Sequence, residues 1–188
     1  MIIDCPVCNG NQTAASTTKT SNIPHFGEIL ESSIICSVCG YKHNDVICLE
    51  QKEPTKHILA INKDSLKSRV IKSQSATVSI PELGLKVEPG PKSLGYVSNV
   101  EGVIVRFEDG VKKALAIFDD EESQKNGLAI LEKLSMLING DIEAILVIED
   151  PFGQSNIMDI NVEQVPLTEE ELRHLKTGFT IIEEKSLE

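Results

Sequence analysis

The chain has 188 residues, of which 40% are hydrophobic, and its formal net charge at pH 7 is −11. This length predicts one full domain and a small additional module. No apolar run is long enough to cross a bilayer, and the first residues lack a signal-peptide core, so we expect a cytoplasmic protein with no membrane partner. The acidic charge argues against nucleic acid as a partner, because binding to phosphate backbones depends on Lys and Arg displacing counterions.

Four of the five cysteines form two Cys-x-x-Cys pairs, Cys5 with Cys8 and Cys36 with Cys39. Four thiolates are the ligand set of a tetrahedral structural zinc ion, and such a metal can fold a segment that has little core of its own. We therefore interpret residues 1–52 as a zinc ribbon in which these four cysteines bind Zn. The fifth cysteine, Cys48, is interpreted as a small buried apolar residue.

The stretch between the two pairs contains the apolar segment Ile23-Pro24-His25-Phe26 in polar surroundings. Two interpretations stay open for it: it docks onto the neighbouring domain, or it forms a partner-binding tip. Our candidate partner-binding residues are Ile23, His25 and Phe26. A fifth metal ligand at His25 is not needed, since four thiolates are already present.

Three strands are predicted in the zinc ribbon: the threonine-rich residues 11–22, then residues 28–35, then residues 42–49. A polar passage with Pro54 marks the boundary to a second module, residues 53–188. This module begins with short β-rich segments, which cover residues 57–61, 69–71, 76–80 and 85–87.

The apolar period changes from two to between three and four at Asn99. It predicts a helical hairpin over about residues 99–138, with an acidic connection at residues 119–122 and a stop at Asn139-Gly140. A buried strand at 143–148 and an outgoing strand at 155–160 follow, and Thr168 begins a last helix. The fold class is therefore α+β: a zinc ribbon and then a mainly β domain with an inserted helical hairpin.

Two functions other than binding of a protein partner are considered. A nucleic-acid-binding zinc ribbon acting in translation or transcription has in its favour only a loose group of cations: Lys63, Lys67, Arg69 and Lys72. A thiol oxidoreductase would leave the second cysteine pair without a role. The sequence shows no phosphate loop and no nucleophile context, so we expect a protein that is not an enzyme.

Several short motifs, in order along the chain, resemble the ZPR-type zinc-finger family. Beside the cysteine pairs they are Ile23-Pro24-His25-Phe26, Cys36-Ser37-Val38-Cys39-Gly40-Tyr41, Val70-Ile71-Lys72-Ser73, Ile80-Pro81-Glu82-Leu83, Val100-Glu101-Gly102 and Asp150-Pro151-Phe152-Gly153. Eukaryotic members are similar to two such units in tandem, and this chain resembles a single one.

The resemblance implies a β domain similar to a double-stranded β-helix, with zinc ligands at Cys5, Cys8, Cys36 and Cys39. It also implies binding to the elongation factor 1-alpha GTPase, with chaperone-like assistance in the folding of that factor, and growth-factor-receptor binding in eukaryotic relatives. From it we expect a zinc-dependent protein-interaction factor whose partner is an elongation factor 1-alpha type GTPase.

Overall fold

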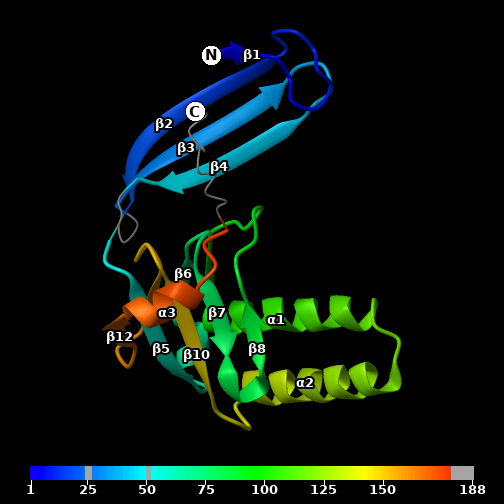
Figure 1. The fold of residues 1–188 in the computed structure, drawn as a ribbon, viewed down its shortest axis with the longest axis vertical. Helices are drawn as coiled ribbons and strands as arrows, with labels where there is room; N and C mark the ends of the chain where they lie inside the picture. Colours follow the sequence, from blue (N-terminus) through cyan, green and yellow to red (C-terminus); the bar gives the residue numbers. More distant parts are fainter. Residues whose placement is uncertain (24–26, 50–51, 179–188) are drawn as a thin grey trace, which may run out of the picture. The chain divides into compact units, whose positions relative to one another are not determined.

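The computed structural model describes residues 1–23, 27–49 and 52–178 (Figure 1). The chain divides into two compact units, Met1–Lys52 and Glu53–Glu188, and each is described by itself. Among the described residues, no helix combines the length and the apolar character that crossing a bilayer requires.

The first unit is a four-stranded antiparallel sheet in the order β1-β2-β3-β4. The strands are β1 (Ile2–Ile3), β2 (Ala14–Ile23), β3 (Gly27–Cys36) and β4 (Lys42–Cys48). β2 and β3 pair along their whole length, and this ladder ends with Ala14 opposite Cys36. The β-branched residues of β2 suit this extended pairing, as the sequence predicted. The described residues of the unit bury few apolar side chains: Cys5, Ala14, Ile29 and Cys36.

The second unit contains a five-stranded sheet, β12-β5-β10-β7-β8, and a three-stranded sheet, β11-β6-β9. Their bounds are β5 (Thr55–Ile61), β6 (Arg69–Lys72), β7 (Thr77–Ile80), β8 (Leu85–Val87), β9 (Tyr96–Asn99), β10 (Ala144–Asp150), β11 (Asn156–Met158) and β12 (Glu163–Pro166). Short 3₁₀ turns, η1 (Ser65–Lys67) and η2 (Pro81–Leu83), join strands. Side chains of both sheets share one apolar core.

Three strands were not predicted: β1, β9 and β12. β12 reads Glu-Gln-Val-Pro and lies at the edge of its sheet, where it pairs only with β5 among the described strands. Edge strands carry polar residues and proline, so they lack the apolar signal of a buried strand. β5 also begins at Thr55, inside the passage that the sequence assigned to the boundary between modules.

The predicted helical hairpin is present as α1 (Val100–Leu115) and α2 (Glu121–Asn139), which lie side by side in Figure 1. Each helix has a side-chain cap: the Gly102 N–H donates to Asn99 Oδ1, and the Ser123 N–H donates to Asp120 Oδ1. Gly140 ends α2 with a φ of 71°, which is the predicted stop. A third helix, α3 (Glu169–His174), begins with a capping box at Thr168.

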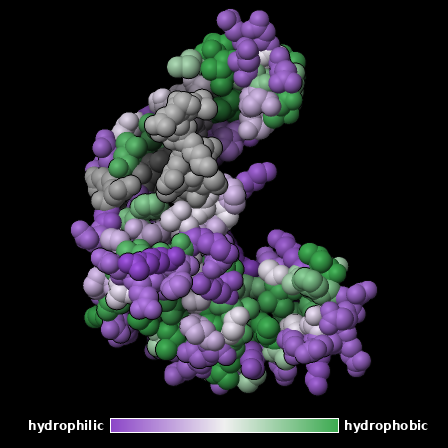
Figure 2. Space-filling model, in the orientation of Figure 1, coloured by the Kyte–Doolittle hydropathy of each residue, from purple (hydrophilic) through white to green (hydrophobic). Residues whose placement is uncertain are grey.

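Only the base of the hairpin joins the core. Val100, Val103, Ile104 and Phe107 of α1, with Leu134 and Leu137 of α2, are buried. The apolar period of the sequence continues beyond the buried part of the hairpin: Phe118 and Leu128 at its free end are 56% and 60% exposed. There the helices pack on each other: a Cβ at Gly127 would lie 2.4 Å from Leu115 Cδ2. Figure 2 shows hydrophobic surface near the end of α1.

A group of buried polar residues surrounds the end of β10. The Asp150 carboxylate is fully buried and accepts hydrogen bonds from Ser75 Oγ and Ser155 Oγ and from the backbone N–H groups of Phe152 and Gln154. These bonds hold the turn after the strand and satisfy the buried charge. In the turn Asp150-Pro151-Phe152-Gly153, the Gly153 N–H also donates to the Asp150 carbonyl oxygen.

Candidate metal centre

The sulfur atoms of Cys5, Cys8, Cys36 and Cys39 all lie within 4.8 Å of one another. Two of their separations are 3.6 Å, from Cys5 to Cys39, and 3.8 Å, from Cys8 to Cys36. A tetrahedral zinc ion with Zn–S bonds of about 2.3 Å requires sulfur atoms about 3.8 Å apart. The cluster therefore has the ligand type and the spacing of a structural zinc site.

Two tight turns position these sulfur atoms. The Val7 N–H donates to Cys5 Sγ at 3.5 Å, and the Val38 N–H donates to Cys36 Sγ at 3.4 Å. The second turn ends at Gly40 with a φ of 71°, a conformation that glycine adopts without strain. Asn9 follows the first turn with a φ of 56°, in the left-handed region that asparagine tolerates better than most residues.

The electrostatics of the cluster also favour a bound cation. A backbone hydrogen bond from Cys39 lowers the pKa of the Cys36 thiol to about 6, and one from Cys8 lowers the pKa of Cys5. For Cys39, the Tyr41 backbone lowers the pKa, but burial and the other three thiols together raise it to about 12. Four thiolates this close repel each other, and a zinc ion removes the repulsion while it fills the tetrahedron.

The structure describes only some of the other residues that are candidates for binding or metal ligation. His25 and Phe26 lie outside the described residues, as does the side chain of Ile23, so the partner-binding tip stays a prediction. The side chain of Cys48 is likewise outside the description. His43 is not in the metal cluster; its ring stacks on Tyr41 with the planes at 4°.

One feature of the site was missed. Val7 and Val38 hold equivalent positions in the two Cys-x-x-Cys turns, and both side chains are exposed, Val7 to 60% and Val38 to 69%. Their backbone N–H groups donate to the sulfur atoms of Cys5 and Cys36, and their side chains point into solvent. The sequence contained a signal for these exposed side chains. A polar residue would suit an exposed turn position, but both Cys-x-x-Cys turns have valine there.

The group of cations considered for nucleic-acid binding is not one surface. Lys72 is 3% exposed, and its Nζ donates to the Ser73 carbonyl oxygen at 2.8 Å. Burial lowers the pKa of Lys72 to about 8, although the Asp150 charge opposes this shift. Lys63 lies against Gly140, the residue that ends α2. Only Lys67 and Arg69 remain together, because both line one surface pocket.

Comparison with known proteins gives two matching family models. The ZPR1 zinc-finger domain matches residues 1–51, and the ZPR1 jelly-roll domain matches residues 64–176. The jelly-roll description fits the mainly β second unit, which contains the sheets and the hairpin.

Relatives of two kinds are found. A ZPR1-like protein of Methanocaldococcus jannaschii is 41% identical over 96% of this chain and 92% of its own length. The zinc finger protein ZPR1 of Homo sapiens is 29% identical, and the zinc finger chaperone zpr1 of Schizosaccharomyces pombe is 27% identical. Each match to these two covers more than four fifths of this chain but 35% of the relative. The chain thus corresponds to about a third of the eukaryotic proteins.

Proposed function

The chain belongs to the ZPR1 zinc-finger family, and from this membership we propose that it is a zinc-dependent chaperone or binding partner of an elongation factor 1-alpha type GTPase. It would act in the cytoplasm, by binding rather than by catalysis. None of the relatives described above is named as an enzyme.

The observation that carries the chaperone part is the Schizosaccharomyces pombe relative, which is named a zinc finger chaperone and matches 82% of this chain. The elongation factor as client comes from the family resemblance of the sequence motifs. The structure supports a binding role through the rigid thiolate cluster and through apolar side chains that lie exposed on both units.

The free end of the hairpin offers one surface for a client in addition to the predicted tip at Ile23, His25 and Phe26. Ile117 and Phe118 follow the end of α1 and are 74% and 56% exposed. Exposed apolar groups of this size stabilise a complex when a partner covers them, by about 25 cal/mol for each Å² of apolar surface removed from water. The acidic chain would in addition attract a basic client, and this attraction weakens with salt.

The test is a binding assay between the zinc-loaded full chain and a purified elongation factor 1-alpha type GTPase of the same cell. We expect saturable binding that the Cys36→Ser, Cys39→Ser double variant loses. Ile117→Ser with Phe118→Ser is expected to weaken binding at least tenfold. The matched control replaces two exposed apolar residues of the β unit, Val87→Ser with Leu94→Ser, and is expected to leave the affinity unchanged.

Absence of binding by the zinc-loaded chain would contradict the proposal. Ile23→Ser with Phe26→Ser tests the predicted tip in the same assay.

A pull-down from cell extract addresses the alternative function. If the chain recovers nucleic acid or ribosomal components and loses them on nuclease treatment, the nucleic-acid-binding zinc ribbon replaces the chaperone.

A further inference from the structure

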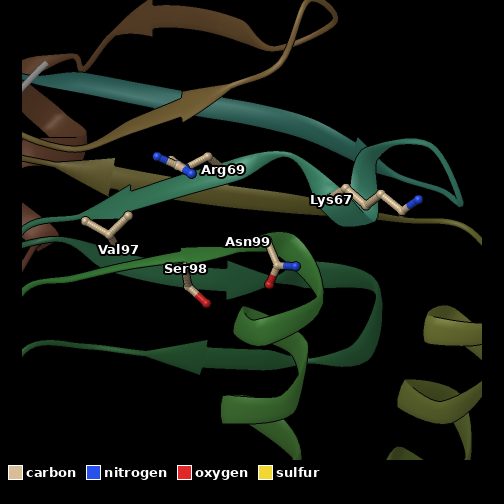
Figure 3. A pocket seen from close by; sticks show the side chains of 5 residues that line it. All are labelled: Lys67, Arg69, Val97, Ser98 and Asn99. Atoms are coloured by element: carbon tan, nitrogen blue, oxygen red, sulfur yellow. The ribbon is translucent and has the colours of Figure 1, made fainter. Parts of the chain in front are cut away.

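A surface pocket of about 470 Å³ lies in the β unit and is lined by Lys67, Arg69, Val97, Ser98 and Asn99. Figure 3 shows these residues where η1 and β6 run beside β9 and the start of α1. Arg69 pairs with Asn99 across the β6–β9 ladder. In Figure 3 the side chains of Arg69 and Val97 lie on one side of these strands, and those of Ser98 and Asn99 lie on the other side, where α1 begins.

Neither cation of this pocket forms an ion pair with another residue that the structure describes. Ion pairs among the described residues use Lys56, Lys86, Lys112, Arg173 and Lys176, and neither Lys67 nor Arg69 takes part in one. The nearby Asp159 carboxylate instead accepts hydrogen bonds from Ser68 Oγ and the Asn161 N–H.

Apolar surface adjoins the two cations. Val97 is 54% exposed in the pocket, and Met158, which pairs with Arg69 from the other side in the β11–β6 ladder, is 42% exposed. Asn99 uses its Oδ1 to cap α1, which leaves its side-chain N–H groups as additional donors. The pocket and its rim thus carry two positive charges, whose ends point in opposite directions in Figure 3, together with amide donors and apolar surface. The pocket is too large for a single phosphate ion.

We propose that this pocket docks an acidic segment of a partner protein, in which carboxylates pair with Lys67 and Arg69 and an apolar side chain packs on Val97 and Met158. Charge complementarity selects this occupant. Two cations are too few to follow a nucleic-acid backbone, whose binding grows with each phosphate neutralised. The site is separate from the apolar end of the hairpin and does not depend on the proposed GTPase client.

The experiment uses fluorescence anisotropy with the zinc-loaded full chain and a short fluorescein-labelled peptide in which glutamates flank one valine. We expect saturable binding that weakens as salt rises, and no binding of the same peptide with glutamine in place of glutamate. Lys67→Gln with Arg69→Gln should weaken the affinity about tenfold, as expected for the loss of two exposed ion pairs. Val97→Ser should weaken it further.

A matched control separates the pocket from the charge of the whole chain. Lys125→Gln with Lys133→Gln removes the same charge from exposed positions of α2 and should leave the affinity within twofold of the original chain. Equal losses in both double variants would overturn the proposal. Binding of an RNA oligonucleotide or of inorganic phosphate without any binding of the peptide would also overturn it. Peptide binding that appears only after truncation behind Gly178 would overturn it too, because the chain's own end would then be the occupant.

Discussion

The two units of this protein reach a stable fold by different means. The zinc unit, residues 1–52, packs Ile3, Ile34 and Tyr41 around Cys5, Ala14 and Cys36, so that its small cluster is centred on metal ligands. The β unit, residues 53–188, has an apolar core to which both sheets and the base of the hairpin contribute. The difference indicates that the stability of the zinc unit depends on the free energy of metal binding. The stability of the β unit depends on the area of apolar surface that it buries.

The largest effect that tests this comparison is metal removal. Cys36→Ser with Cys39→Ser, or chelation of the zinc, should unfold the zinc unit, because structural zinc supplies about 10–16 kcal/mol of apparent binding free energy. The β unit should stay folded. Amide spectra recorded by NMR would show collapse of the signals from residues 1–52 and retention of those from the second unit.

The control for metal removal is Cys48→Ser, since this cysteine was assigned no ligand role. It should retain both sets of signals and the zinc content. Loss of the β-unit signals together with those of the zinc unit would contradict independent folding of the two units.

A smaller effect is expected from the core of the β unit. Leu146 lies in β10 opposite Leu59 of β5, and both are buried. Leu146→Ala should lower the free energy of unfolding of this unit by about 2–5 kcal/mol, because it leaves a cavity in the shared apolar core. Denaturant unfolding followed by the fluorescence of Tyr96, in a Tyr41→Phe background, measures it without signal from the zinc unit.

The neighbouring Ile145 supplies the matched control. It points to the opposite face of β10 and is 39% exposed, so Ile145→Ala should cost much less than Leu146→Ala. Zinc affinity, measured by competition with a chelator, should be the same in both variants. A weaker zinc affinity in Leu146→Ala would show that the two units stabilise each other.

The sequence predicted those features that repeat or that need a particular residue type. The thiolates had a fixed spacing, the hairpin had a helical period, and Gly140 and Thr168 ended or began helices as glycine and threonine do. It did not predict where a helix stops being buried. Leu128 continues the apolar period of α2 and is nevertheless exposed, because the sheets end before the hairpin does.

The burial of polar residues was also not predicted from the sequence. Lys72 follows an apolar pair in the sequence and looked like part of a surface patch, but it is enclosed near Asp150 and Tyr96. Such a position depends on residues far along the chain: Ser73, for example, donates its N–H to Ser155 Oγ. No local pattern carries that information, since most lysines are exposed.

The smallest expected effect comes from His57, which is 1% exposed in β5. Neither of its ring nitrogens has a hydrogen-bond partner among the described residues. Burial lowers the pKa of this histidine, while a backbone contact with Ser155 and the charge of Asp150 oppose the shift. The unfolded chain therefore binds the proton more readily than the folded β unit does.

It follows that the β unit loses stability as the pH falls below the unfolded histidine pKa of about 6.5, by at most about 1.4 kcal/mol per pH unit for one proton. Above that pH, His57 is neutral in both states and contributes no pH dependence. Denaturant unfolding at several pH values in the Tyr41→Phe background measures the slope. His57→Phe should flatten it and His43→Phe, in the zinc unit, should not. Because acid also protonates zinc-bound thiolates, a slope that survives His57→Phe would place the acid sensitivity of the β unit in another group.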